Sequence, residues 1–159
     1  MTKLKYKLTD EKIEVNGHTL HRIVSLRSFG RVKAGDKGGF IQKESNLSHD
    51  GDCWVGGDAW VYDNAEVFGN AIVSGEAEVR GKAKVFSSAW VYSKAKVFDE
   101  AEISGNAEVS DNAKVYGNAW VHGEARVYDN ARVYGGAVVY GKASVCGNAV
   151  VCGDSMLDK

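Results

Sequence analysis

The sequence predicts an all-β chain folded as a single-stranded parallel β-helix, with a small β-rich cap at its N-terminal end. Three observations carry this prediction. From Ala59 onward the chain consists of sixteen six-residue units without insertion or deletion. Alanine holds the first place of every unit, and valine holds the third place of all units but one, where Ile103 stands. The fifth place holds only glycine, aspartate or serine, which are residues of tight turns.

The six-residue period does not fit an amphipathic helix, because alanine at that spacing gives no continuous stripe on a period of about 3.6 residues. A strand fits, since its first and third residues point to one side and its second and fourth residues to the other. Each unit is therefore expected to form a short strand and a turn, with alanine and valine lining the interior. Glycine and asparagine tolerate the left-handed backbone of such turns, and the chain has 19 glycines and no proline.

The pattern of an aliphatic residue preceded two places earlier by a small one resembles the hexapeptide-repeat left-handed β-helix family. The resemblance covers residues 47–157 and implies three units per turn, residues 18 apart in stacked positions, a left-handed coil and about six turns. Aromatic residues often follow the aliphatic one here, as at Tyr62 and Phe68, where that family usually has small or acidic residues. The stretch Val32–Val55 also resembles the leading segment of a β-helical family from bacterial and phage genomes, some members of which are labelled as transferases.

Residues 1–46 lack the repeat and are expected to form the cap, and residues 47–159 the β-helix. Lys5–Leu8 and Lys12–Val15 are predicted strands, and Asn16-Gly17 is a hairpin signal before a third strand at His18–Leu26. The cap would protect the first coil from edge pairing. It carries 10 Lys/Arg against 5 Asp/Glu, whereas the repeat region carries 10 against 16, so the chain is polarised in charge.

Stacking at 18 residues predicts three outward faces, of which one combines cations with aromatic residues. Its members are Trp60, Tyr62, Arg80, Lys96, Phe98, Lys114, Tyr116 and Arg132. Such a face suits single-stranded nucleic acid or another anionic polymer. The alternative is packing between coils, with cations lying over rings or pairing with acids such as Glu78. We favour packing, because the repeat region as a whole is acidic.

The last turns carry apolar residues at outward places with few charges among them. They are Tyr134, Val138, Tyr140, Val150 and Met156. Such a collar favours burial against another copy of the chain, as a dimer or a trimer.

Catalysis has one candidate residue. Many hexapeptide β-helices are trimeric acyltransferases with a histidine base between subunits, and His122 is the only histidine of the regular repeat. It lacks an orienting carboxylate in the repeat pattern, so we interpret it as a surface residue. His49 is expected to be structural, and His18 and His21 flank a predicted strand. No cofactor and no metal site are expected, because the acids of the turns do not align and the cysteines form no zinc motif.

These patterns predict a non-catalytic, oligomeric binding or scaffold protein of bacterial or phage origin that acts on a protein partner. Inhibition of a host defence or nucleic-acid enzyme would fit such a surface. The alternative is a hexapeptide acyltransferase that uses His122 at a trimer interface. A cytoplasmic location is expected, since no apolar run approaches the roughly 20 residues of a membrane span and the first residues lack a secretory apolar core.

Overall fold

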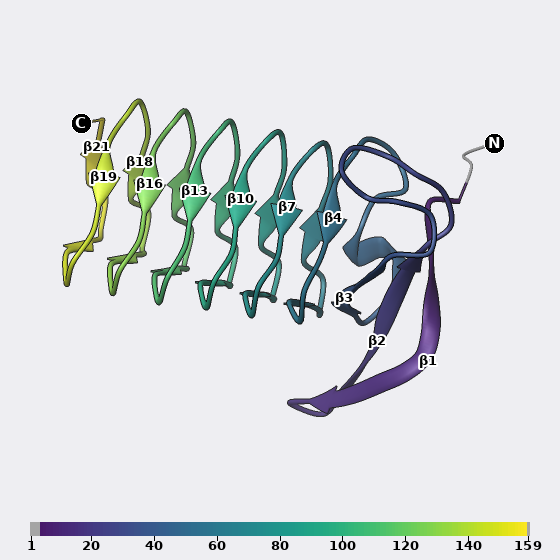
Figure 1. The fold of residues 1–159 in the computed structure, drawn as a ribbon. Coiled ribbons are helices and arrows are strands. Elements are labelled where there is room, and N and C mark those ends of the chain that lie inside the picture. The colour runs from purple at the N-terminus through teal and green to yellow at the C-terminus, as the bar shows by residue number, and fades with distance from the viewer. Residues whose placement is uncertain (1–3, 159) are drawn as a thin grey trace.

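The computed structural model describes residues 4–158, which form a parallel β-solenoid preceded by an antiparallel hairpin (Figure 1). The expected boundary between residues 46 and 47 stays a prediction, and residues 1–3 and 159 of the two expected segments lie outside the described residues. The second and third residues of each unit form a two-residue strand. Trp90 pairs with Ile72 on one side and with Glu108 on the other, so residues 18 apart are neighbours. This confirms three units per turn.

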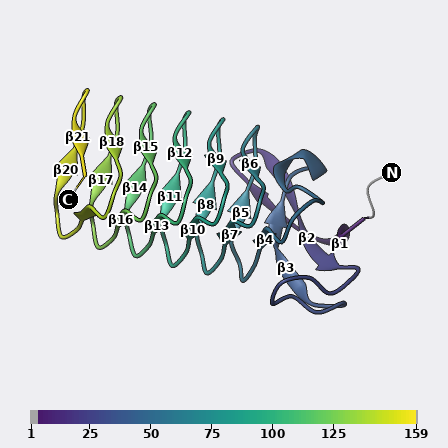
Figure 2. The same ribbon diagram turned by 90° about the horizontal axis from the view of Figure 1, so that it is seen from above.

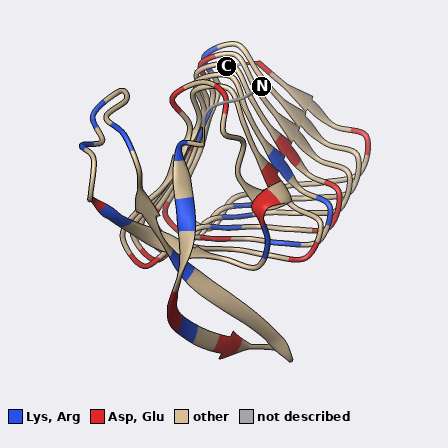
Figure 3. Cartoon of the chain, turned by 90° about the vertical axis from the view of Figure 1, so that its right-hand side faces the viewer, with Lys and Arg blue, Asp and Glu red and all other residues tan. Residues whose placement is uncertain are grey.

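The short strands stack into three parallel sheets, one on each side of the coil (Figures 2 and 3). The strands of the cationic face are β5 (Trp60–Val61), β8 (Glu78–Val79), β11 (Lys96–Val97), β14 (Lys114–Val115), β17 (Arg132–Val133) and β20 (Val150–Val151). The strands of the Trp90 face are β4 (Trp54–Val55), β7 (Ile72–Val73), β10 (Trp90–Val91), β13 (Glu108–Val109), β16 (Arg126–Val127) and β19 (Ser144–Val145). The strands of the Trp120 face are β6 (Glu66–Val67), β9 (Lys84–Val85), β12 (Glu102–Ile103), β15 (Trp120–Val121), β18 (Val138–Val139) and β21 (Met156–Leu157).

The interior of the coil is a continuous column of alanine and valine. From Ala59 to Ala143 every first-place alanine is at most 1% exposed, and the third-place residues are equally buried as far as Val139. Successive coils are joined by backbone hydrogen bonds that repeat with the period, such as Trp90 N–H to Ala107 O at 2.9 Å. The predicted inward frame is therefore confirmed.

The turns use the left-handed backbone at the fifth place of each unit, where φ lies between 57° and 69°. Glycine and aspartate occupy most of these places, and the asparagines of the sixth place do not adopt this conformation. Each aspartate gains a second role there, because its carboxylate accepts the backbone N–H of the residue 18 positions later. Asp99 Oδ2, for example, lies 3.0 Å from Gly117 N. These carboxylates fasten one coil to the next.

The N-terminal region begins with β1 (Tyr6–Val15) and β2 (His18–Ser25), an antiparallel hairpin that turns at Asn16-Gly17. The two strands expected before this turn form one strand whose register shifts between Leu8 and Lys12. Strand β3 (Lys37–Ile41) pairs antiparallel with β2 and parallel with β5, and the 3₁₀ turn η1 spans Glu44–Asn46.

Strand β3 therefore joins the hairpin and the cationic face into one nine-stranded sheet. The cationic face has seven stacked parallel strands from β3 to β20, whereas the sequence predicted about six turns beginning at residue 47. The hairpin lies at the N-terminal end of the coils, and its strands extend beyond their outline (Figures 1 and 3). Tyr6 and Ile23 of the hairpin join the buried cluster that continues into the coil interior. None of residues 4–158 belongs to a helix long and apolar enough to span a bilayer.

Candidate functional site

Three cations stand in register on neighbouring strands of the cationic face. Lys96 pairs with Lys114, and Lys114 pairs with Arg132, across the parallel sheet. Lys96 Nζ lies 3.7 Å from Glu78 Oε2 in an ion pair. Within residues 4–158, neither Lys114 nor Arg132 forms an ion pair with a carboxylate. Like charges directly opposite on adjacent strands repel, so this column is electrostatically unfavourable in the isolated chain.

The aromatic residues of the same face form a closed stack beside the cations. The ring centroids of Phe98 and Tyr116 are 4.8 Å apart at 2°, and those of Tyr116 and Tyr134 are 4.9 Å apart at 8°. The guanidinium of Arg80 lies 4.2 Å from the Phe98 ring and covers the free end of the stack. Both faces of the Phe98 and Tyr116 rings are thus occupied by neighbouring side chains. This geometry favours packing between coils for these residues.

The hairpin removes the first two aromatic residues from the predicted face. Tyr62 is only 1% exposed and its hydroxyl accepts a hydrogen bond of 3.1 Å from Asn16 Nδ2. Its ring and that of Trp60 pack in a cluster with Leu20 and Phe40. Burial raises the pKa of Tyr62. The inclusion of Tyr62 in an open binding face is therefore corrected, because a segment remote in sequence covers it.

The residues of the expected collar divide into two groups. Tyr134 is half-buried by the ring stack, and Val138 and Tyr140 are also half-buried within the Trp120 face. Val150 and Met156 are 52% and 68% exposed. Only these two residues of the predicted collar are open to solvent to this degree.

His122 lies within a stack of aromatic rings. Its ring centroid is 4.2 Å from that of Trp120 and 5.5 Å from that of Tyr140. Burial lowers the pKa of His122. Among residues 4–158 no carboxylate bonds to this ring, so nothing there orients it as a general base. The indole of Trp120 reaches back one coil and donates to Ser104 Oγ at 3.1 Å.

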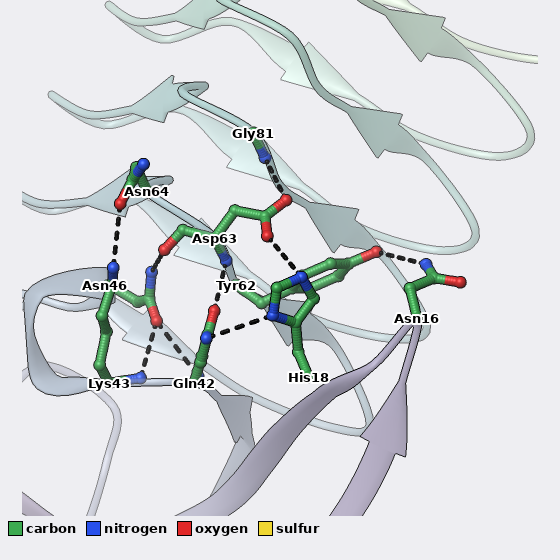
Figure 4. Close-up of polar contacts among 9 residues, drawn as sticks. All are labelled: Asn16, His18, Gln42, Lys43, Asn46, Tyr62, Asp63, Asn64 and Gly81. Carbon is green, nitrogen blue, oxygen red and sulfur yellow. Dashed lines mark hydrogen bonds and ion pairs between the residues drawn. The ribbon is translucent and has the colours of Figure 1, made fainter.

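A polar cluster that the sequence did not predict joins the hairpin to the first coils (Figure 4). His18 Nε2 lies 2.9 Å from Asp63 Oδ1, and His18 Nδ1 lies 3.3 Å from Gln42 Nε2. Gln42 Oε1 accepts the backbone N–H of Asp63 at 2.8 Å, and Asp63 Oδ2 accepts that of Gly81 at 3.2 Å. Asp63 thereby contacts the hairpin through His18, the residue after β3 through Gln42, and the next coil through Gly81.

Asn46 is the buried centre of this cluster. Its Oδ1 accepts the backbone N–H groups of Gln42 and Lys43 at 3.1 and 2.9 Å. Its Nδ2 donates to the carbonyls of Asp63 and Ala65 at 3.2 and 2.8 Å. All four bonds run between backbone and one side chain, so Asn46 fixes the path by which the chain enters the regular coil.

A second cluster lies where β1 begins. The Lys5 ammonium is buried and lies 2.7 Å from Cys53 O and 3.3 Å from Cys53 Sγ. Burial lowers the pKa of Lys5 and raises that of the Cys53 thiol. The ring of His49 stacks on Tyr6 at 4.2 Å and accepts the backbone N–H of Lys5 at Nδ1, at 3.1 Å. The structural role expected of His49 agrees with these contacts.

A groove of about 730 Å³ follows the corner between the Trp90 face and the cationic face, over turn residues such as Asp111, Asn112, Asp129 and Asn130. Asp111 Oδ2 and Asp129 Oδ2 already accept backbone N–H groups of the next coil at 3.1 and 3.0 Å. Across residues 4–158, no group of three or more His, Cys, Asp or Glu side chains is arranged to hold a metal ion. The groove is thus a structural corner with polar amides at its rim.

Comparison with known proteins supports the repeat architecture. A family model described as the YdcK beta solenoid repeat matches residues 107–123 and 125–141. Both matched stretches are made of regular hexapeptide units. No curated protein matches the chain. The match therefore supports a repeat β-solenoid, and it carries no information about activity.

Proposed function

We propose that this β-solenoid is a non-catalytic binding scaffold that docks an acidic segment of a protein partner on its cationic face. The observation that carries the proposal is the register of Lys96, Lys114 and Arg132 on successive strands, with a carboxylate beside only the first. Carboxylates of a partner would offset the repulsion within this column. Among residues 4–158, two of the three cations in this column have no carboxylate partner, and the column runs along neighbouring strands of one face, so docking would have a defined orientation.

The closed ring stack favours a protein partner over single-stranded nucleic acid. Sequence-tolerant binding of single strands uses open aromatic faces on which bases stack. A base between two rings needs about 3.4 Å on each side. The 4.8 and 4.9 Å between the rings of Phe98, Tyr116 and Tyr134 leave no such space. The charged groups of Lys96, Lys114 and Arg132 are therefore the groups of this face that are available for binding, and the stacked rings pack beside them.

A binding assay with defined probes tests this function. The probes are poly-glutamate and an oligo-thymidine of equal charge. The test protein is the double variant that combines Lys114→Gln with Arg132→Gln. We expect the double variant to bind poly-glutamate about tenfold more weakly at low salt, a loss of about 1.4 kcal/mol. The matched control is Lys84→Gln with Lys142→Gln, which removes the same charge from exposed places elsewhere on the solenoid. An equal loss in the control, or tighter binding of oligo-thymidine than of poly-glutamate, would contradict the proposal.

We also propose that two copies associate through the last coils, with the exposed Val150 and Met156 as the contact residues. Trp120, Val138 and Met156 stand in register on the Trp120 face and form one apolar column that ends at Met156. Trp120 is 43% exposed, so the column offers apolar area to a second copy. We further propose that the chain is of bacterial or phage origin and that such a scaffold inhibits a host enzyme.

Light scattering tests the association. The double variant Val150→Glu with Met156→Lys should fold normally, because both side chains are exposed, and should be a monomer where the natural chain is an oligomer. Glu76→Lys with Lys94→Glu is the charged control, because it also keeps the net charge and changes exposed residues at the corner between the Trp90 face and the cationic face. A monomeric natural chain at micromolar concentration, or an oligomer that survives the double change, would refute the association.

A further inference from the structure

We propose that His18 and His49 form an acid-sensitive clamp that holds the N-terminal hairpin against the first coils. In this clamp, proton binding to either ring is incompatible with the contact that the ring makes. The two histidines act at opposite ends of the same hairpin, since His18 begins β2 and His49 binds the chain at Lys5, just before β1. This inference is independent of the docking function proposed above.

The tautomer of His18 follows from a chain of obligatory donors (Figure 4). The backbone N–H of Asp63 can only donate, so the group of Gln42 that faces it at 2.8 Å is the carbonyl oxygen. The amide nitrogen of Gln42 must then face His18 Nδ1 at 3.3 Å, and it too can only donate. His18 Nδ1 is therefore unprotonated. Its Nε2 therefore carries the single proton of the neutral ring and lies 2.9 Å from Asp63 Oδ1 in an ion-pair contact.

His49 is locked in the same tautomer by an independent contact. The backbone N–H of Lys5 donates to His49 Nδ1 at 3.1 Å, so this nitrogen has no proton. His49 Nε2 then donates to Glu44 Oε1 at 3.3 Å. Adding a proton to Nδ1 of either ring would place two N–H groups against each other.

His21 offers a built-in comparison within the same hairpin. Its Nδ1 lies 3.0 Å from the carbonyl oxygen of Thr9, which can only accept. His21 Nδ1 therefore already carries a proton, and a second proton on Nε2 leaves this bond intact. The geometry thus separates two acid-sensitive histidines from one that tolerates either state.

The surrounding charges do not remove the conflict at Nδ1. Asp63 and Glu44 attract an imidazolium, yet both lie at the Nε2 side of their rings, so neither carboxylate contacts Nδ1. Among the described residues, Tyr62, Lys43 and Lys82 lie near His18. Tyr6 and Lys5 lie beside the His49 ring, and Arg27 bonds to the backbone carbonyl of His49. Rotating the Gln42 amide would relieve His18 only by setting the amide N–H against the N–H of Asp63.

A drop in pH from about 7.5 to about 5 should therefore loosen the hairpin while the coils persist, because acid favours the doubly protonated ring. Hydrogen exchange followed by mass spectrometry, at about pH 7.5 and about pH 5 and corrected for intrinsic rates, measures this directly. We expect amides of β1 and β2 to lose protection about tenfold at the lower pH, with amides of β8–β17 unchanged. In the double variant His18→Gln with His49→Gln the response should vanish, because glutamine offers a donor and an acceptor without titrating. In His21→Gln it should persist.

Nitrogen NMR of the imidazole rings provides a second measurement that does not depend on the variants folding normally. At neutral pH, His18 and His49 should both be neutral with the proton on Nε2, and His21 should carry a proton on Nδ1. A proton on Nδ1 of His18 or His49 at neutral pH would overturn the proposal. So would an unchanged acid response in the double variant, or full hairpin protection in acid with either ring charged.

Discussion

The coils and the N-terminal region both bury their side chains, but by different means. In the coils the same alanine, the same valine and the same backbone hydrogen bonds recur on every turn. In the N-terminal region each contact occurs once, as with the Lys5 ammonium on Cys53 O or the four bonds of Asn46. Removing one repeated contact should cost little stability, because the equivalent contacts of the neighbouring coils remain. Removing a unique contact should cost more, because no equivalent contact remains.

The largest effect is expected from a charge placed inside the coil. Val97 is fully buried, so Val97→Asp would bury an unpaired carboxylate and cost about 5 kcal/mol, comparable to the stability of a small domain. Lys96→Ala changes the neighbouring outward residue and should have little effect. Circular dichroism melting curves compare the two variants. Similar melting temperatures would show that the inward frame is misassigned.

A unique contact should come next. Asn46→Ala leaves the Lys43 N–H and two backbone carbonyls without this partner, while the Gln42 N–H keeps only its bond of 3.2 Å to Val61 O, and we expect a loss of about 3 kcal/mol in the free energy of unfolding. Asn64→Ala is the control, because Asn64 is exposed and only accepts a bond from Lys43 Nζ. Denaturant unfolding measures both. Equal losses of unfolding free energy in the two variants would show that the buried contacts of Asn46 stabilise the chain no more than the exposed contact of Asn64.

Tyr6 should give a smaller, pH-dependent effect. Its hydroxyl lies 2.6 Å from Leu47 O and 3.0 Å from Glu44 O, so Tyr6→Phe should cost about 1 kcal/mol at neutral pH. Burial raises the pKa of Tyr6. A phenol with a raised pKa in the folded state gives stability that is complete below its ordinary value of about 10 and is lost as the pH rises further. The difference between the natural chain and Tyr6→Phe should therefore shrink above about pH 10, and a constant difference would argue against this burial.

The smallest effect is expected from a single repeated contact at a turn. Asp99→Ala removes the acceptor of Gly117 N–H at an exposed corner, and should cost about 0.5 kcal/mol. Asp99→Gly loses the same bond but relaxes a backbone with φ of 59°, so it should be nearly neutral. Thermal unfolding of both variants provides the comparison. A loss in the free energy of unfolding as large as that of Asn46→Ala would show that the other turn contacts do not compensate for the missing one.

The period explains why the coils could be predicted from sequence and the start of the solenoid could not. Strand β3 lacks the alanine and valine of the repeat, because its two glycines lie against the first coil. A Cβ at Gly38 would come within 2.5 Å of Val55 O, and one at Gly39 within 2.5 Å of Ala59 O. Ile41 is in register with Val61 at the third place, but Gly39 holds the first place because no side chain fits there, so this strand shows only part of the repeat pattern. The number of turns was underestimated for this reason.

The outward residues were assigned to the correct faces, because stacking at 18 residues determines their neighbours. Their exposure could not be predicted in the same way. Tyr62 is covered by Asn16 and Leu20, which are more than forty residues earlier in the chain, and no periodicity links them. The contacts of His18 with Asp63 and Gln42 likewise join three segments that only the folded hairpin brings together.

The identity of successive coils has a consequence for how the length of this molecule can change. Each coil contacts only the coils before and after it, and its inner surface is the same alanine and valine column. Loss or gain of 18 residues would shift the far end by about 4.8 Å and keep every outward side chain on its own face. Loss or gain of a single hexapeptide would instead rotate all later units by one face relative to the hairpin. Duplication of a whole coil thus keeps the arrangement of outward side chains on the three faces. Duplication of a single unit moves the side chains of all later units to a different face.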